Sequence, residues 1–207
     1  MKGLLLKDLA YIRRSRLLGI VVFMAAVFFF AGSNFAVTYM GIMASTMVQT
    51  TFSYDDFRGG MKYILTLPIT RKQYVQSKYL LSVLLGSCGI VVGSLVQLVL
   101  QPGNGYTVGE TMALLLTSGG VVLLLNAINI PMMLKYGAER GRLMAVCVLV
   151  GVAAIIGVGA FVLMDAINIS PAEFNIWTAT AGLLTVVAVS LWISYRISLK
   201  IIEKKEY

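Results

Sequence analysis

Histidine is absent from this chain of 207 residues, and cysteine occurs only twice. The absence of an imidazole argues against catalysis that depends on histidine and against most metal sites. Cys88 and Cys147 lie inside apolar runs without zinc-ligand spacing, which is typical of small apolar core residues. No segment matches G-x-x-x-x-G-K-[ST], so the chain lacks a loop that cradles nucleotide phosphates. We therefore expect neither an enzyme nor a cofactor or metal on this chain.

Charge is also scarce, at 13% of the residues, whereas soluble domains carry about 25%. Hydrophobic residues make up 58% of the chain, and the mean hydropathy is +0.86. The net charge of +8 does not predict a nucleic-acid partner, because the basic residues flank apolar runs instead of forming their own domain. These values predict an all-α, polytopic membrane protein whose basic residues meet anionic lipid headgroups.

Six apolar segments approach the roughly 20 residues that cross a bilayer, and the first extends into Arg14 and Arg16, whose long side chains can snorkel. Residues 17–54 carry no charge but as one helix would reach roughly 57 Å, so the chain must turn at Gly32-Ser33-Asn34. We predict one transmembrane domain over residues 1–207 and no signal peptide. Its spans lie near residues 14–31, 35–52, 79–100, 111–134, 143–164 and 176–195.

All seventeen lysines and arginines fall on one side of these spans. They lie in the N-terminal segment, the loops after the second and fourth spans, and the C-terminal tail. The positive-inside bias places this side and both termini in the cytoplasm. The opposite side carries only three charged residues, which are Glu110, Asp165 and Glu173.

Residues 1–12 have the pattern of an amphipathic helix on the inner membrane surface. Apolar residues recur at helical spacing: Leu5, Leu6, Leu9 and Ile12. Charged residues fall largely elsewhere on the helical wheel: Lys2, Lys7, Asp8 and Arg13. The alternative is a positively charged flank of the first span.

The loop at residues 53–78 is long for this chain and contains a strong helix start. Thr70 and Gln73 match the capping-box pattern, Ile69 can pack on Tyr74 as a hydrophobic staple, and Pro68 favours a turn before them. We predict a short helix with a rigid basic tip facing the cytoplasm. The alternative is a helix that only leads into the third span. The loop at residues 135–142 is compact and contains two glycines. It is either a short turn or a second docking point.

Three blocks of sequence together resemble the ABC type-2 transporter family of small bacterial permeases. The first is MKGLLLKDL at residues 1–9. The second combines FSYDD at 52–56, LPITR at 67–71 and KYL at 78–80. The third combines Pro131 with KYGAERGR at 135–142. The blocks occur in the family's order, and the resemblance in order and topology covers nearly the whole chain.

The resemblance implies a permease subunit in the bacterial plasma membrane, working with a second permease and a separate ATPase that binds ATP and Mg²⁺. It implies an exporter of amphipathic or antimicrobial peptides or lipid-like compounds. The alternative is an ATPase-independent sensor or peptide-immunity protein. Residues 1–12 would be the elbow helix. The coupling helix would include Leu67, Pro68, Ile69, Thr70, Arg71, Lys72, Gln73 and Tyr74. A secondary ATPase contact would include Tyr136, Gly137, Ala138, Glu139 and Arg140.

An acidic pair, Asp55 and Asp56, lies where the family has one, and would fix the loop against Arg58, Lys62 or the ATPase. The alternative is a solvated charge cluster at a helix end.

Small and polar residues inside the spans indicate helix contacts. Two small-x-x-x-small patterns allow close packing, within the chain or between subunits: Gly89 with Gly93, and Ala153 with Gly157. Three amides lie at membrane depth: Gln97, Asn126 and Asn129. Because lipid offers no hydrogen-bond partners, they should face the bundle interior, where they join helices or line a pathway.

Overall fold

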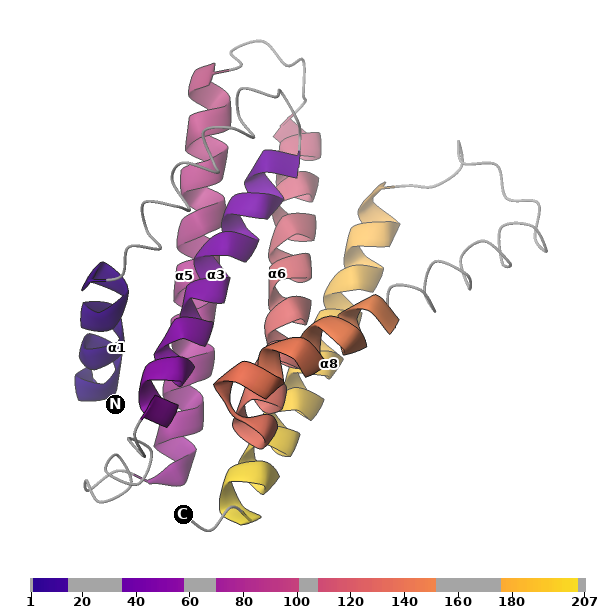
Figure 1. The fold of residues 1–207 in the computed structure, drawn as a ribbon. Coiled ribbons are helices and arrows are strands. Elements are labelled where there is room, and N and C mark those ends of the chain that lie inside the picture. Colours follow the sequence, from indigo (N-terminus) through magenta and orange to yellow (C-terminus); the bar gives the residue numbers. More distant parts are fainter. Residues whose placement is uncertain (1, 15–34, 58–69, 101–107, 152–175, 205–207) are drawn as a thin grey trace, which may run out of the picture.

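The computed structural model describes residues 2–14, 35–57, 70–100, 108–151 and 176–204. These parts of the chain are helical and contain no strand, which confirms the all-α prediction. The helices are α1 (Lys2–Arg14), α3 (Phe35–Asp56), α5 (Arg71–Leu100), α6 (Val108–Tyr136), residues 138–151, and α8 (Ile176–Lys204). In Figure 1, α3, α5, α6 and α8 run side by side and α1 lies beside one end of this bundle.

Three of the described helices are long and apolar enough to cross a membrane. Their spanning segments are Arg71–Val99 in α5, Gly109–Tyr136 in α6 and Thr180–Lys204 in α8. Helix α3 occupies the place of the predicted second span. The first predicted span, the fifth beyond residue 151 and nearly all of both outer loops lie outside the described residues. The six-span topology and the cytoplasmic location of the termini stay predictions.

Helix α5 corrects the prediction for the long loop. It runs without a break for 30 residues, about 45 Å, and begins at Arg71 instead of Tyr79. The segment predicted as a separate short helix is therefore the first two turns of the third span. No glycine or proline interrupts residues 71–79, and the charge of Lys78 is neutralised inside the protein. Nothing in this segment ends a helix.

Two glycines on α5 pack closely against α3. A Cβ atom added at Gly89 would lie 2.6 Å from Ala44 Cβ and 2.7 Å from the Met40 carbonyl oxygen on α3. A Cβ atom at Gly93 would lie 3.2 Å from the Cα atom of Val37. Both glycines thus permit close approach within the chain. Ala153 and Gly157 lie outside the described residues.

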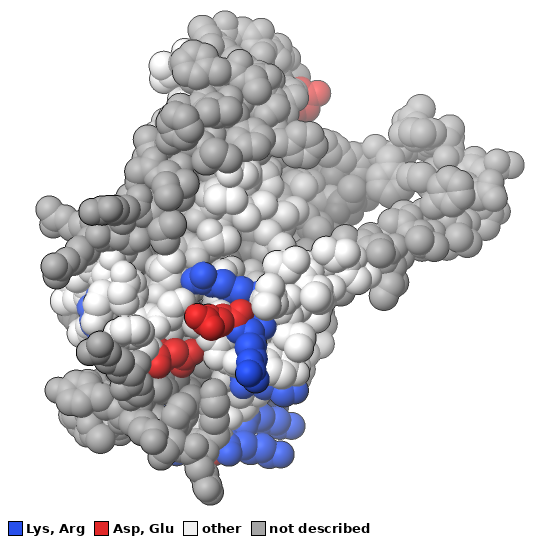
Figure 2. All heavy atoms as spheres, in the orientation of Figure 1, with Lys and Arg blue, Asp and Glu red and all other residues white. Residues whose placement is uncertain are grey.

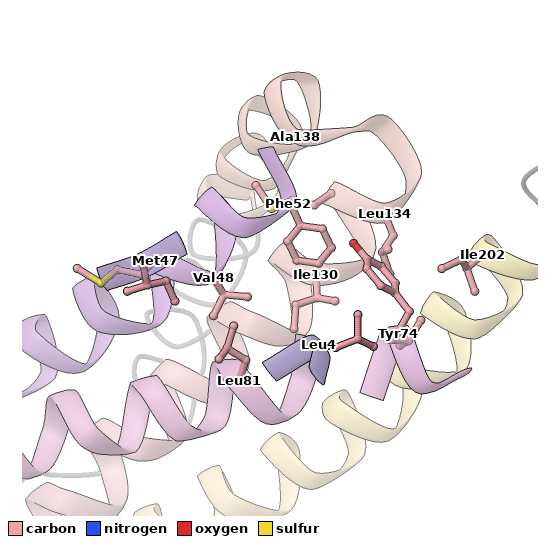
Figure 3. Close-up of a cluster of buried hydrophobic side chains, with 13 residues drawn as sticks. Leu4, Met47, Val48, Phe52, Tyr74, Leu81, Ile130, Leu134, Ala138 and Ile202 are labelled. Atoms are coloured by element: carbon pink, nitrogen blue, oxygen red, sulfur yellow. The ribbon is translucent and has the colours of Figure 1, made fainter. Parts of the chain in front are cut away.

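The largest apolar core lies at one end of the bundle, where α3, α6 and α8 end and α5 begins. We call this the basic end. Buried side chains from α1, α3, α5, α6, α8 and residue 138 meet there (Figure 3). They are Leu4, Ile12, Met47, Val48, Phe52, Tyr74, Val75, Leu81, Ile130, Met133, Leu134, Ala138 and Ile202. This core fixes the relative positions of the segments predicted to contact an ATPase.

Candidate functional site

Charged side chains of the described residues concentrate at the basic end. Figure 2 shows lysines and arginines gathered toward the lower part of the visible face, with acidic groups among them. The segments predicted for the elbow helix, the coupling helix and the second loop all contribute to this end. We therefore take the helix junction there as the candidate functional site.

The start of α5 has the predicted capping box. The backbone N–H of Gln73 donates to Thr70 Oγ1 at 3.3 Å, and the backbone N–H of Thr70 donates to Gln73 Oε1 at 3.2 Å. This reciprocal pair satisfies backbone donors in the first turn and holds the helix start rigid. Thr70 and Lys72 are exposed there. Leu67, Pro68 and Ile69, and with them the predicted staple, lie outside the described residues.

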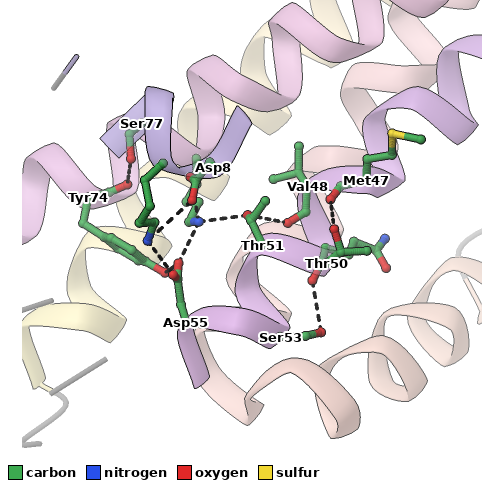
Figure 4. Close-up of polar contacts among 12 residues, drawn as sticks. Asp8, Met47, Val48, Thr50, Thr51, Ser53, Asp55, Tyr74 and Ser77 are labelled. Carbon is green, nitrogen blue, oxygen red and sulfur yellow. Dashed lines mark hydrogen bonds and ion pairs between the residues drawn. The ribbon is translucent and has the colours of Figure 1, made fainter. Parts of the chain in front are cut away.

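A buried ion network joins α1, α3 and α5 immediately beyond this start (Figure 4). The ammonium nitrogen of Lys78 lies 2.9 Å from Asp8 Oδ2 and 2.7 Å from Asp55 Oδ2. It also donates to Thr51 Oγ1 at 2.8 Å, while the Thr51 hydroxyl donates to the Val48 carbonyl. The side chains of Lys78 and Asp8 are each 1% exposed. A charge so deeply buried needs such partners, because desolvating it alone costs several kcal/mol.

Asp55 is the centre of this network. It accepts from Lys7 Nζ at 2.6 Å and from the Tyr74 hydroxyl at 2.9 Å, in addition to Lys78. Burial opposes the charge of Asp55, but Lys78 and Lys7 outweigh it and hold the pKa of Asp55 below its ordinary 3.8. Burial likewise opposes the charge of Lys7, but Asp55 and Asp8 raise the pKa of Lys7 above its ordinary 10.5. Asp55 and Lys7 are thus both charged near neutral pH.

Asp8 and Lys78 were not among the predicted site residues. Asp8 was assigned to the polar face of α1, but it lies on the buried face with Leu4 and Ile12. Leu6 and Leu9 point away from the protein and are 66% and 52% exposed. Helix α1 therefore has one apolar face toward the bundle and another facing outward. The i, i+4, i+8 spacing of Leu4, Asp8 and Ile12 was the available signal, since it places an acid on an apolar stripe.

Asp56 faces a different neighbour from Asp55. Its Oδ2 atom accepts the backbone N–H of Ala138 at 2.8 Å, at the start of the helix that follows α6. The Arg142 guanidinium also donates to Ser53 Oγ at 3.0 Å. The predicted partners Arg58 and Lys62 lie outside the described residues. The acidic pair therefore contacts two separate parts of the junction.

The second predicted ATPase contact surrounds a sharp chain turn. Gly137 has a φ of +81°, a left-handed conformation that glycine adopts without strain, and it separates α6 from residues 138–151. Ala138 is buried, whereas Tyr136, Glu139 and Arg140 are exposed. The exposed residues are available to a partner, and Gly137 and Ala138 shape the turn that presents them.

Helix α8 ends against the start of α5. Arg71 Nη1 donates to the carbonyl oxygens of Ile202 at 3.0 Å and Glu203 at 2.9 Å. Cations at a helix C-terminus satisfy free carbonyls and complement the helix dipole. About two turns deeper, the Tyr79 hydroxyl lies 2.6 Å from Ser194 Oγ. Arg71, predicted as part of a docking tip, thus has partners within the chain.

The amides at membrane depth have no established role. Asn126 is buried, and its Nδ2 atom donates to the Val122 carbonyl of its own helix at 2.8 Å. Gln97 and Asn129 are partly buried. A place on a transport pathway stays a prediction for all three. The described part of the chain contains no cluster of three or more metal-ligating His, Cys, Asp or Glu residues.

Comparison with known proteins gives one family match. The family described as "ABC-2 family transporter protein" matches residues 3–203, nearly the full chain. No curated protein and no solved structure matches significantly.

Proposed function

The chain belongs to the ABC-2 transporter family, and we propose that its basic end receives a separate ATPase and carries the motion of that ATPase into the helix bundle. Membership makes the chain a membrane permease component of an ABC transporter. ATP and Mg²⁺ would bind to the partner, with the permease responding mechanically. Two docking segments are proposed, the start of α5 and residues 136–140.

The observation that supports this proposal is the continuity of α5 with its buried ion network. If the ATPase displaced the exposed first turn of α5, which Thr70 caps, the whole 30-residue helix would move with it. Because Lys78 binds Asp8 on α1 and Asp55 on α3, these helices would move together with α5. Such coupling requires that the ATPase bind two bundle arrangements with different affinities.

Lys72 is the residue that tests the docking site most cleanly. It is exposed in the first turn of α5, whereas neighbouring Arg71 binds the end of α8. Lys72→Glu should weaken co-purification with the partner ATPase and reduce ATPase stimulation. Lys200→Glu makes the same charge change at an exposed position on α8 and should leave both intact. Equal effects of the two substitutions would place docking elsewhere.

We also propose export of amphipathic or antimicrobial peptides or lipid-like compounds across the bacterial plasma membrane, with a second permease subunit. The resemblance to the family supports the direction and cargo class. Large apolar side chains exposed on α5 and α8, including Leu95, Leu98 and Val189, would suit lipid or a second subunit. Cells that express the chain with its ATPase should tolerate a membrane-active peptide better than cells with a hydrolysis-deficient ATPase. Equal tolerance would argue against this cargo.

A further inference from the structure

The last turn of α3 holds the start of the helix at residues 138–151. Asp56 Oδ2 accepts the Ala138 N–H at 2.8 Å, and Ser53 Oγ accepts from Arg142 at 3.0 Å. The residues in these pairs lie 82 and 89 positions apart in sequence. The two contacts therefore join the first cytoplasmic-side loop region to the second.

The N-terminus of the helix at residues 138–151 is capped by a side chain of α3, because the residue before it in sequence cannot act as a cap. The residue before Ala138 is Gly137, whose N–H donates to Met133 O and whose carbonyl accepts the N–H of Gly141. Gly137 thus ends α6 and begins the next helix, but it has no side chain that can accept an N–H. The Asp56 carboxylate fills this role, and its negative charge suits the positive end of the helix dipole.

Asp55 and Asp56 make the end of α3 a link between both proposed docking segments. Asp55 binds Lys78 and Tyr74 on α5, while its neighbour Asp56 binds Ala138. A shift of the α5 start would therefore reach residues 136–140 through two adjacent carboxylates. Ala138 is only 6% exposed, so this contact is packed as well as hydrogen-bonded.

We propose that Asp56 is a positioning residue that joins the two docking segments into one ATPase-binding surface. This inference rests on the proposed function for its ATPase partner, but the joining itself is a property of the chain alone. The proposed role of Asp56 involves no contact with a nucleotide or with the cargo. It sets where the exposed Glu139 and Arg140 lie relative to the first turn of α5.

The joining is tested without any ATPase. Spin labels at Lys72→Cys and Glu139→Cys, in a Cys88→Ser, Cys147→Ser background, would report the separation of the two docking segments in the purified chain. Asp56→Ala should broaden the distance distribution and raise the separated population about fivefold, the effect typical of losing one helix cap. Asp56→Asn retains an acceptor oxygen and should keep the narrow distribution, as should the control Glu203→Ala. An unchanged distribution in Asp56→Ala, or equal broadening in Asp56→Asn, would overturn the inference.

A double-mutant cycle tests the shared surface. Arg140→Glu should weaken ATPase binding in the otherwise unaltered chain but have little further effect together with Asp56→Ala, because residues 136–140 would no longer be held in place. Additive effects would overturn the inference. If the ATPase fails to bind even the unaltered chain, the proposed function fails, while the spin-label result still decides whether Asp56 joins the segments.

Discussion

Lys78 of α5 and Asp55 of α3 form an ion pair at 2.7 Å in which the side chains are 1% and 3% exposed. Asp8 of α1 forms a second ion pair with Lys78, at 2.9 Å. Buried pairs of this kind are weak evidence for overall stability, but removing one partner is costly. Here the pair joins three helices immediately beyond the proposed docking turn, so its disruption should affect both folding and coupling.

Removal of the Lys78 charge should destabilise the protein. Lys78→Met leaves Asp8 buried without its principal partner, and the expected loss is about 3–5 kcal/mol. The double variant Asp8→Leu, Lys78→Met removes both charges and should recover most of this loss. Thermal unfolding of the detergent-solubilised protein measures both effects, with Lys72→Met as an exposed control. A single variant as stable as the unaltered chain would contradict the buried network.

The network should contribute evenly across the neutral pH range. The pKa of Asp55 is lowered in the fold, so its contribution is complete above about pH 4 and falls as pH drops through the folded pKa. The pKa of Lys7 is raised, so its contribution is complete below about pH 10 and falls as pH rises through the folded pKa.

The stability difference between the unaltered chain and Asp55→Asn should therefore be constant from about pH 5 to 9 and narrow below about pH 4. Thermal unfolding at a series of pH values measures this difference. A difference that peaks or vanishes near pH 7 would show that another titrating group controls the junction.

Arg71 should hold the last turn of α8 in place. Arg71→Ala removes two hydrogen bonds to the carbonyls of Ile202 and Glu203, so amide exchange in the final turn of α8 should accelerate. The expected local loss is about 1 kcal/mol, or roughly fivefold in exchange rate. Hydrogen-exchange mass spectrometry provides the measurement. Lys72→Ala, at the adjacent exposed position, should leave that exchange unchanged, and similar acceleration in both variants would argue against a specific cap.

Gly89 should be intolerant of any side chain. Gly89→Ala places a Cβ atom 2.6 Å from Ala44 Cβ and 2.7 Å from the Met40 carbonyl oxygen, so α3 and α5 must separate. The expected cost is about 1–3 kcal/mol. Gly182→Ala on α8 makes the same change with no atom within 4 Å and should be neutral. The fraction of each variant that stays folded after heating measures the difference. Equal heat stability of the two variants would refute the close α3–α5 contact.

Features that depend on residues close together in sequence were predicted correctly. Thr70 and Gln73 predicted the cap at the start of α5, since a capping box involves residues only three apart. The apolar runs predicted the starts of α3 and α8, at Phe35 and Ile176. The start of the third-span helix was misplaced because Lys78 was placed in the preceding loop, whereas it is buried inside α5 beside Asp8 and Asp55.

The long-range contacts of the helix junction could not be predicted from the sequence. The helical wheel of residues 1–12 gave one polar and one apolar face, and it carried no information that Asp8 would meet Lys78, 70 residues away. The acidic pair was singled out, but its division between α5 and Ala138 depends on how α3 ends between two other helices. Such pairings arise from tertiary packing, which spacing along one chain segment does not encode.

We propose that the ATPase docks on the first turn of α5. A photocrosslinking amino acid placed at position 72, in membranes that contain both proteins, tests this most directly. We expect an adduct between permease and ATPase from position 72 and none from position 200 on α8. An intact complex that gives no adduct at position 72 would contradict the claim.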